Sequence, residues 1–207
     1  MADVLVSIDR TLIAALVGRV AEHVIAHADE LTVLDQAIGD GDHGINMKRG
    51  FAAVMAEIDA ISAQPLPGAL KAAGMQMVMK VGGASGPLYG TLFMGLGKGL
   101  SDAPSRDEAV TAFGAAIEAV KARGKAQAGD KTMLDVLIPV HAAAAEGADF
   151  ATLRRVASQA AEATIAMQAK RGRASFLGER SIGHMDPGAR SSQLLVEAVC
   201  EVLEGAP

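Results

Sequence analysis

The chain has 207 residues, half of them hydrophobic but only 3% aromatic, and its formal net charge is −5. This length suits one domain over residues 1–207, and the acidic balance argues against a nucleic-acid partner, which would require a basic face. No apolar run is long enough to span a membrane, no signal peptide is evident, and the single Cys200 excludes an internal disulfide, so we expect a cytoplasmic protein.

The hydrophobic residues are mainly Ala, Leu, Val, Ile and Met, a mixture that favours helices over strands. The first predicted helix covers residues 8–29, where apolar residues recur every four positions from Ile8 to Val24.

A polar, acidic loop is predicted next, within the stretch from Leu34 to Met47. It contains Asp35, Asp40 and Asp42 together with three glycines. Three carboxylates this close remain ionised most easily around a hard cation, because Mg²⁺ and Ca²⁺ prefer oxygen ligands. The alternative is an ordinary chain reversal, since Asp and Gly are also common turn residues.

The second predicted helix, over residues 43–61, begins directly at this acidic loop. Its first residues are His43, Gly44, Ile45 and Asn46. The backbone N–H groups at a helix N-terminus lack partners within the helix and form a natural phosphate site. We therefore expect a phosphate beside the metal.

A second glycine-rich loop, residues 81–87, separates a predicted helix at 68–80 from one that ends near residue 100. It contains Ala84 and Ser85 among three glycines. Such a loop can cradle a phosphate through its backbone N–H groups, but a tight helix–helix connection explains it equally well.

Four more helices are predicted in the second half, at residues 105–122, 131–146, 150–171 and from Pro187 to the end. For the first of these, Ser105 with Glu108 three residues later predicts a capping box. The connections include a polar turn at 123–133 and a long irregular segment at 172–188. A loop of that length is more often functional than idle.

The loops that carry unusual chemistry alternate along the chain. In an up-and-down bundle of about eight helices, alternate loops lie at the same end. The segments 35–42, 82–86, 124–131 and 173–188 would then meet at one rim. This convergence is stronger support for a binding site than any single loop.

Several familiar sites are excluded by the sequence. It has no Gly-x-x-x-x-Gly-Lys-Ser/Thr, and Phe51 stands where a calcium loop begun at Asp40 needs a bidentate Glu. No Cys pair or His-Glu-x-x-His supports zinc. A carboxylate–Mg²⁺ centre flanked by helix N-termini and arginines suits a nucleoside diphosphate or triphosphate, and phosphoryl transfer needs mainly positioning and charge neutralisation.

Four long stretches, in order and spread over essentially the whole chain, resemble the nucleotide-binding L subunit of dihydroxyacetone kinases driven by the phosphotransferase system: LDQAIGDGDHGINM, GGASGPLYGTLF, GDKTMLDVL and GRASFLGERSIGHMDPGARSS. The resemblance implies an all-α, eight-helix up-and-down antiparallel barrel with tightly bound ADP or ATP at one end. The magnesium ligands of that family match Asp35, Asp40 and Asp42. Its nucleotide contacts match the following residues: His43, Gly44, Ile45, Asn46, Ala84, Ser85, Gly124, Met133, Arg173, Asp186, Pro187 and Gly188.

The resemblance also implies partners. A phosphohistidine on an M subunit would rephosphorylate the bound ADP, and the phosphoryl group would pass to dihydroxyacetone held on a K subunit. Three alternatives remain open: a kinase subunit for another short ketose or sugar, a non-catalytic nucleotide sensor that binds a transcriptional regulator, and a structural bundle that binds no nucleotide.

Overall fold

The computed structural model describes residues 8–206, and over this range the protein contains helices and no strand. The prediction about an N-terminal leader concerns residues 1–7, which lie outside this range. The helices are α1 (Arg10–Ala26), α2 (Ala28–Ile38), α3 (His43–Ala56), α4 (Ile58–Ser62), α5 (Leu66–Lys80), α6 (Ser85–Gly99), α7 (Arg106–Gly124), α8 (Leu134–Ala145), α9 (Phe150–Ala163) and α10 (Pro187–Glu204), with short 3-10 helices η1 (Thr164–Ala166) and η2 (Arg173–Ser181).

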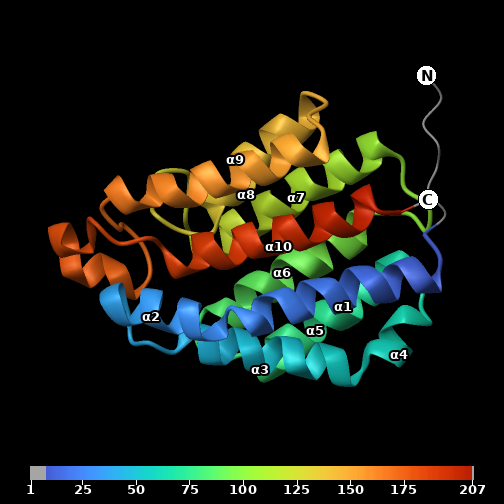
Figure 1. Cartoon of the computed structure of the whole chain (residues 1–207), viewed down its shortest axis with the longest axis horizontal. Coiled ribbons are helices and arrows are strands. Elements are labelled where there is room, and N and C mark those ends of the chain that lie inside the picture. Colours follow the sequence, from blue (N-terminus) through green and yellow to red (C-terminus); the bar gives the residue numbers. More distant parts are fainter. Residues whose placement is uncertain (1–7, 207) are drawn as a thin grey trace.

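Eight of these helices form a closed ring in which each packs against the next (Figure 1). Going round the ring, α1 packs on α3, α3 on α5, α5 to α10 follow in chain order, and α10 returns to α1. The predicted all-α up-and-down barrel is therefore confirmed. The helix count differs from eight because α2 and α4 are separate short helices that follow breaks after α1 and α3.

The first break corrects the predicted boundaries of the acidic loop. In a regular helix the His27 backbone N–H would donate to the His23 carbonyl. Here the His27 side chain donates to that carbonyl through Nδ1 at 2.7 Å, and the His27 backbone N–H donates to the Val24 carbonyl instead. The chain bends by 54° there and continues as α2. Asp35 therefore lies in the last turn of a helix, and only Asp40 and Asp42 lie in the connecting turn.

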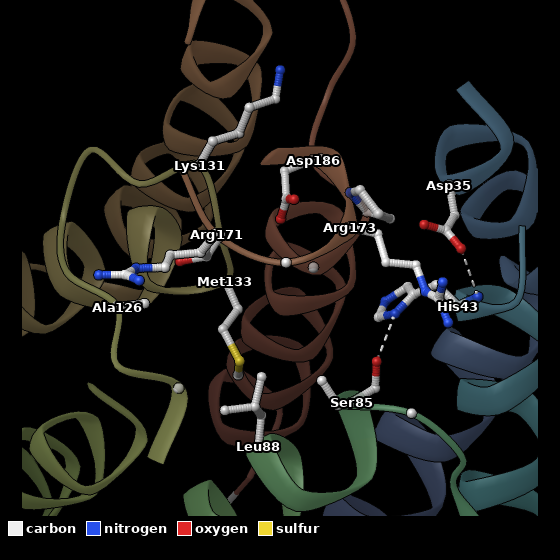
Figure 2. Close-up of a pocket in the computed structure, with 18 of the residues that line it drawn as sticks. Asp35, His43, Ser85, Leu88, Ala126, Lys131, Met133, Arg171, Arg173 and Asp186 are labelled. Carbon is white, nitrogen blue, oxygen red and sulfur yellow. Dashed lines mark hydrogen bonds between the residues drawn. The ribbon is translucent and has the colours of Figure 1, made fainter. Parts of the chain in front are cut away.

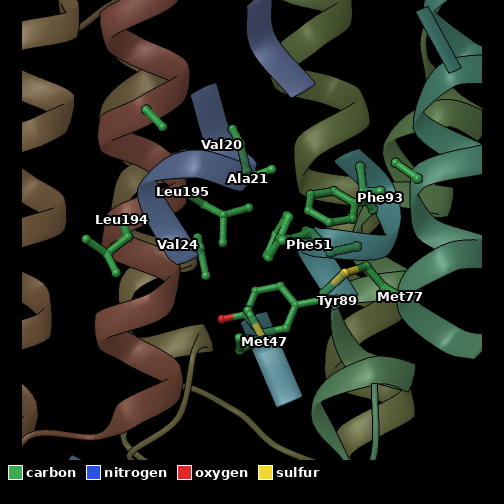
Figure 3. Close-up of a cluster of buried hydrophobic side chains, with 14 of the residues drawn as sticks. Val20, Ala21, Val24, Met47, Phe51, Met77, Tyr89, Phe93, Leu194 and Leu195 are labelled. Carbon is green, nitrogen blue, oxygen red and sulfur yellow. The ribbon is translucent and has the colours of Figure 1, made fainter. Parts of the chain in front are cut away.

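Large apolar side chains fill the ring (Figure 3). Phe51 of α3 and Phe93 of α6 pack edge to face with ring centroids 6.3 Å apart. Met47, Met77 and Tyr89 are completely buried beside them. This core holds α3 and α6 in a fixed relation, which matters because both helices begin at the cavity described below.

The second half departs from the predicted boundaries at α9. That helix was expected to run to residue 171, but it ends at Ala163. The buried hydroxyl of Thr164 donates to the carbonyl of Ala161 at 2.6 Å and accepts the N–H of Asp186 at 3.1 Å, so it ties the end of α9 to the start of α10. The segment between them contains η2, which lies within residues 172–188 that were predicted as irregular.

Two other expectations near helix starts need correction. α8 begins at Leu134 and not at residue 131, because Lys131 has a left-handed backbone with φ 63°. At α7, Ser105 caps the helix by accepting the N–H of Glu108 at 3.2 Å, but the Glu108 carboxylate bonds the Ser101 backbone N–H and hydroxyl and leaves the reciprocal half of the capping box unmade.

Candidate nucleotide and metal site

A cavity of about 490 Å³ opens at one end of the barrel. It is lined by the end of α2 and the turn after it, the start of α6, the connection from α7 to α8, and the segment from Arg171 to Gly188 (Figure 2). These are the four polar connections that the alternation of helices predicts to meet at one rim. The convergence is therefore confirmed by the structure.

One wall of the cavity is acidic. Asp35, Asp40 and Asp42 each offer a carboxylate oxygen, and these three oxygens lie within 4.8 Å of one another. Gly41 between the last two adopts a left-handed conformation, with φ 74°, that turns both carboxylates to the same side. Three oxygen ligands from short carboxylates at this spacing fit a hard cation such as Mg²⁺.

The backbone at the start of α3 holds the acidic wall in place. Oδ2 of Asp35 accepts the N–H groups of Asp42 at 2.8 Å and His43 at 3.1 Å. The N–H of Asn46 donates to the Asp42 carbonyl at 2.9 Å. The expectation that the amides of His43 and Asn46 are free for phosphate is therefore wrong, because both are used within the protein.

His43 itself is buried at the junction of three helices. Its Nδ1 lies 3.0 Å from Oγ of Ser85 on α6, and its Nε2 lies 2.9 Å from Oγ of Ser191 on α10. Burial lowers the pKa of His43 to about 4, although the nearby Asp35 opposes this shift. The imidazole is therefore neutral at physiological pH and links helices together.

An arginine faces the acidic wall from η2. Arg173 Nε lies 2.7 Å from Asp40 Oδ2, and the preceding Gly172 allows the chain to turn there with φ 67°. Arg171 also lines the cavity, and its Nε is 3.6 Å from Asp130. The segment thus brings two arginines to the same cavity as the three aspartates.

The opposite wall is apolar. Leu88, Val120, Ala126 and Met133 line it, and Figure 2 shows Met133 and Leu88 facing each other across from His43 and Asp35. Gly124 also lies on this wall. A flat apolar base fits between such side chains, so the cavity offers an acidic, metal-binding side and an apolar side.

Asp186 lines the cavity and lies between the two walls in Figure 2. It caps α10 by accepting the N–H of Ala189 at 2.7 Å. Burial raises its pKa to about 7, and the carboxylates of Asp135 and Asp35 add to this effect. Pro187 and Gly188 follow as the first residues of α10 and also line the cavity.

All but three of the residues predicted from the sequence line the cavity, and the exceptions are Gly44, Ile45 and Asn46. Gly44 faces α2, where a Cβ would lie 2.7 Å from the Thr32 nitrogen. The Ile45 side chain is exposed, and Asn46 is buried next to Gly82. Whether the remaining residues bind nucleotide stays a prediction.

Several residues that complete the site were not predicted from the sequence. Lys131 is almost completely buried, with a relative exposure of 1%. Its Nζ donates to the carbonyls of Met167 at 3.0 Å and Ser181 at 2.5 Å. Tyr89 and Ser191 form the buried network behind His43. A lysine in a glycine-bearing turn and a serine in a helix have no distinctive spacing, so only their surroundings reveal them.

No single helix among residues 8–206 has the length and apolar composition to cross a membrane, although the bent pair α1 and α2 passes that test when taken together.

Comparison with known proteins places these features in a family. Residues 37–201 match the DAK2 domain. The chain is 46% identical to a PEP-dependent dihydroxyacetone kinase ADP-binding subunit DhaL of Listeria innocua, covering 87% of this chain and 90% of the relative. It is 40% identical to the corresponding subunit of Escherichia coli, covering 92% and 96%.

A solved structure shares the fold. The dihydroxyacetone kinase of C. freundii in complex with AMP-PNP and Mg²⁺ superposes with a TM-score of 0.72 at 23% identity, over 92% of this chain and 34% of that longer chain. Because the domain match covers most of the chain and the two relatives are aligned over nearly their full length, the protein belongs to the DAK2 domain family.

Proposed function

We propose that this protein is the nucleotide-binding subunit of a dihydroxyacetone kinase. In this proposal it holds ADP with Mg²⁺, accepts a phosphoryl group on that ADP from a phosphohistidine of an M-type subunit, and transfers it to dihydroxyacetone bound on a K-type subunit. The products are dihydroxyacetone phosphate and ADP that stays bound for the next cycle.

The observation that carries the proposal is the arrangement of the cavity. Three carboxylate oxygens within 4.8 Å of one another face an apolar wall that contains Met133 and Leu88. This pairing suits the two unlike ends of a nucleotide, its metal-bound phosphates and its base. The DhaL relatives, which are named as ADP-binding subunits, support the same assignment.

The roles of individual residues follow from their positions. Asp35, Asp40 and Asp42 would hold Mg²⁺, which when bound neutralises phosphate oxygens and orients them for transfer. Arg173, beside Asp40, would add positive charge near the transferred group. Ala84, Ser85 and Gly188 line the middle of the cavity, and Gly124 and Met133 line the side assigned to the base.

No nucleophile of the protein is required. Phosphoryl transfer between a nucleotide and a hydroxyl needs alignment and electrostatic stabilisation, and both reacting groups come from outside this chain. The proposal therefore predicts that a partner subunit closes over the cavity and supplies the ketose.

Two measurements test the proposal. Native mass spectrometry of the purified chain should show co-purified ADP and Mg²⁺. Mixed with a K-type subunit, the ATP-loaded chain should then produce dihydroxyacetone phosphate, measured by reduction with glycerol-3-phosphate dehydrogenase and NADH. Nucleotide binding without transfer to dihydroxyacetone would instead favour a sensor or a different ketose, and no nucleotide binding at all would refute the proposal.

A further inference from the structure

A chain of buried hydrogen bonds leads from the cavity into the barrel. Ser85 Oγ at the start of α6 lies 3.0 Å from His43 Nδ1, and His43 Nε2 lies 2.9 Å from Ser191 Oγ. Ser191 Oγ in turn lies 2.6 Å from the hydroxyl of Tyr89. Of these four residues only Ser85 is not fully buried, and Figure 2 shows it joined to His43 beside the cavity.

The direction of these hydrogen bonds can be worked out from the inner end. Ser191 Oγ has one proton, and it lies 2.9 Å from the carbonyl of Pro187 and 3.2 Å from that of Gly188. A carbonyl oxygen can only accept a hydrogen bond. The Ser191 hydroxyl must therefore be the donor in both contacts, and its proton points toward these two oxygens. Ser191 Oγ then has a lone pair free to accept from His43, and Tyr89, whose hydroxyl also lies 3.2 Å from the Gly188 carbonyl, needs no proton from Ser191.

This assignment fixes the tautomer of His43. Its Nε2 must carry the proton that Ser191 accepts, so in the neutral ring Nδ1 has a lone pair and accepts from Ser85. The opposite tautomer would send the Ser191 proton to His43 and leave its oxygen facing two carbonyl oxygens at 2.9 and 3.2 Å with no hydrogen between them. The observed distances therefore favour donation from His43 Nε2 to Ser191 and from Ser85 to His43 Nδ1.

We infer that His43 is a positioning residue that Ser191 holds as its Nε2–H tautomer. In this tautomer His43 Nδ1 accepts the hydrogen bond of the Ser85 hydroxyl, so Ser85 faces the cavity only as a hydrogen-bond acceptor. An oxygen that presents lone pairs cannot donate to a phosphate oxygen. Such an oxygen suits either a cation or an N–H or O–H donor of a ligand, and we assign it to a divalent cation because the three aspartates of the same cavity also suit one.

This inference rests on the proposed function for the identity of the ligand, but its first test does not. In the nucleotide-free chain labelled with ¹⁵N-histidine, long-range ¹H–¹⁵N correlation spectra distinguish the two neutral tautomers, and the His43 signals are assigned by their loss in His43→Gln. The spectra are recorded at about two pH units above the ordinary histidine pKa of about 6.5, where all the rings are neutral.

The protein contains a reference for each outcome. His141 Nε2 lies 3.1 Å from the Val110 carbonyl and must donate through Nε2, whereas His27 Nδ1 donates to the His23 carbonyl. We expect His43 to show the pattern of His141. The pattern of His27, or the averaged pattern of a ring with no fixed tautomer, would overturn the inference whether or not the chain binds ADP.

A matched pair of variants tests the role of Ser191. Ser191 and Ser192 are adjacent, completely buried and both bonded to Tyr89, but only Ser191 touches His43. Ser191→Ala should release the His43 tautomer and weaken Mg²⁺–ADP binding, whereas Ser192→Ala should change neither. Equal effects of the two variants would show that the network only supports folding.

The acceptor role of Ser85 is tested by comparing ADP binding with and without the cation. Ser85→Ala should weaken ADP binding about tenfold in Mg²⁺, the size of one lost interaction of this kind, and should leave binding in EDTA unchanged. Both affinities are measured on the nucleotide-free chain by isothermal titration calorimetry, with a weaker nucleotide as competitor where binding is tight. An equal loss in Mg²⁺ and in EDTA would mean that Ser85 contacts the nucleotide directly and not the cation, and the inference would then be wrong.

Discussion

Arg173 Nε lies 2.7 Å from Asp40 Oδ2, so a cation from η2 is bound to a carboxylate that we assign to the metal. The Arg173 side chain is 72% exposed, and an ion pair this open contributes about 0–1 kcal/mol at most. Such a weak contact can be given up when Mg²⁺ and phosphate enter. Asp40 can thus pair with Arg173 when the site is empty and with Mg²⁺ when the nucleotide is bound.

Replacing Asp40 by Asn should remove one metal ligand with little effect on folding. We expect the rate of phosphoryl transfer to fall by at least about tenfold. Substituting a residue that only hydrogen-bonds to a metal ligand already lowers metal affinity or activity by about 10–100-fold in other proteins. The assay is dihydroxyacetone phosphate formation, with thermal unfolding measured alongside. Asp59→Asn is the matched control, since Asp59 also pairs with an exposed arginine, Arg10, but lies outside the cavity lining. Full activity of Asp40→Asn would contradict the assigned role.

A second prediction concerns Gly44, which the resemblance assigns to the nucleotide but which packs against α2. A Cβ at this position would lie 2.7 Å from the Thr32 backbone nitrogen and closer still to the Ala28 carbonyl oxygen. Gly44→Ala should therefore lower the free energy of unfolding by about 1–3 kcal/mol, measured in urea. In Gly18→Ala the nearest contact is Ile58 Cδ1 at 3.5 Å, so this helical glycine should tolerate alanine or gain about 0.4–1 kcal/mol.

Lys131 provides a third prediction, because its Nζ binds the carbonyls of Met167 and Ser181 at both ends of the segment that carries Arg171 and Arg173. Lys131→Met keeps the length of the side chain but leaves these buried oxygens without a donor, so the unfolding free energy should fall by about 1–3 kcal/mol. Hydrogen exchange should also become faster in residues 168–181. Lys125→Met is the control, since Lys125 is exposed and shares the left-handed backbone. Unchanged exchange in Lys131→Met would argue against this role.

Asp186 gives a prediction about pH. Burial raises its pKa to about 7 in the folded chain, well above the value of about 3.9 expected in the unfolded chain. Between these values the folded state holds a proton that the unfolded state has released, so this group contributes stability below about pH 4 that is lost as the pH rises through about 7. The size of the loss is on the order of a few kcal/mol.

Asp186→Asn should remove this pH dependence while it keeps the oxygen that caps α10. The measurement is urea unfolding of the metal-free chain at a series of pH values between about 4 and about 8. Asp149, which caps α9 by accepting the N–H of Thr152, is the opposite case: hydrogen bonds with Thr152 lower its pKa, so its contribution is lost as the pH falls. An unchanged pH profile in Asp186→Asn would show that other groups dominate.

The sequence was informative wherever one local pattern determines the structure. Apolar spacing with few aromatic residues predicted an all-helical chain, and the alternation of glycine-bearing loops predicted that Asp35, Ser85 and Arg173 would meet at one end. The first and last turns of helices were less predictable. The His27 side chain replaces a backbone donor and starts a new helix, and no periodicity of apolar residues reveals that exchange.

The tertiary structure decided which of the assembled groups remain available to a ligand. From the sequence, the amides of His43 and Asn46 were expected to be free, and Lys131, Tyr89 and Ser191 had no individual role although they lie in the stretches that resemble the family. In the folded protein those amides are bound to Asp35 and Asp42, and the other three side chains form buried hydrogen bonds across the barrel. Hydrogen bonding between residues far apart in the chain depends on their distance and direction in space, which neither composition nor spacing encodes.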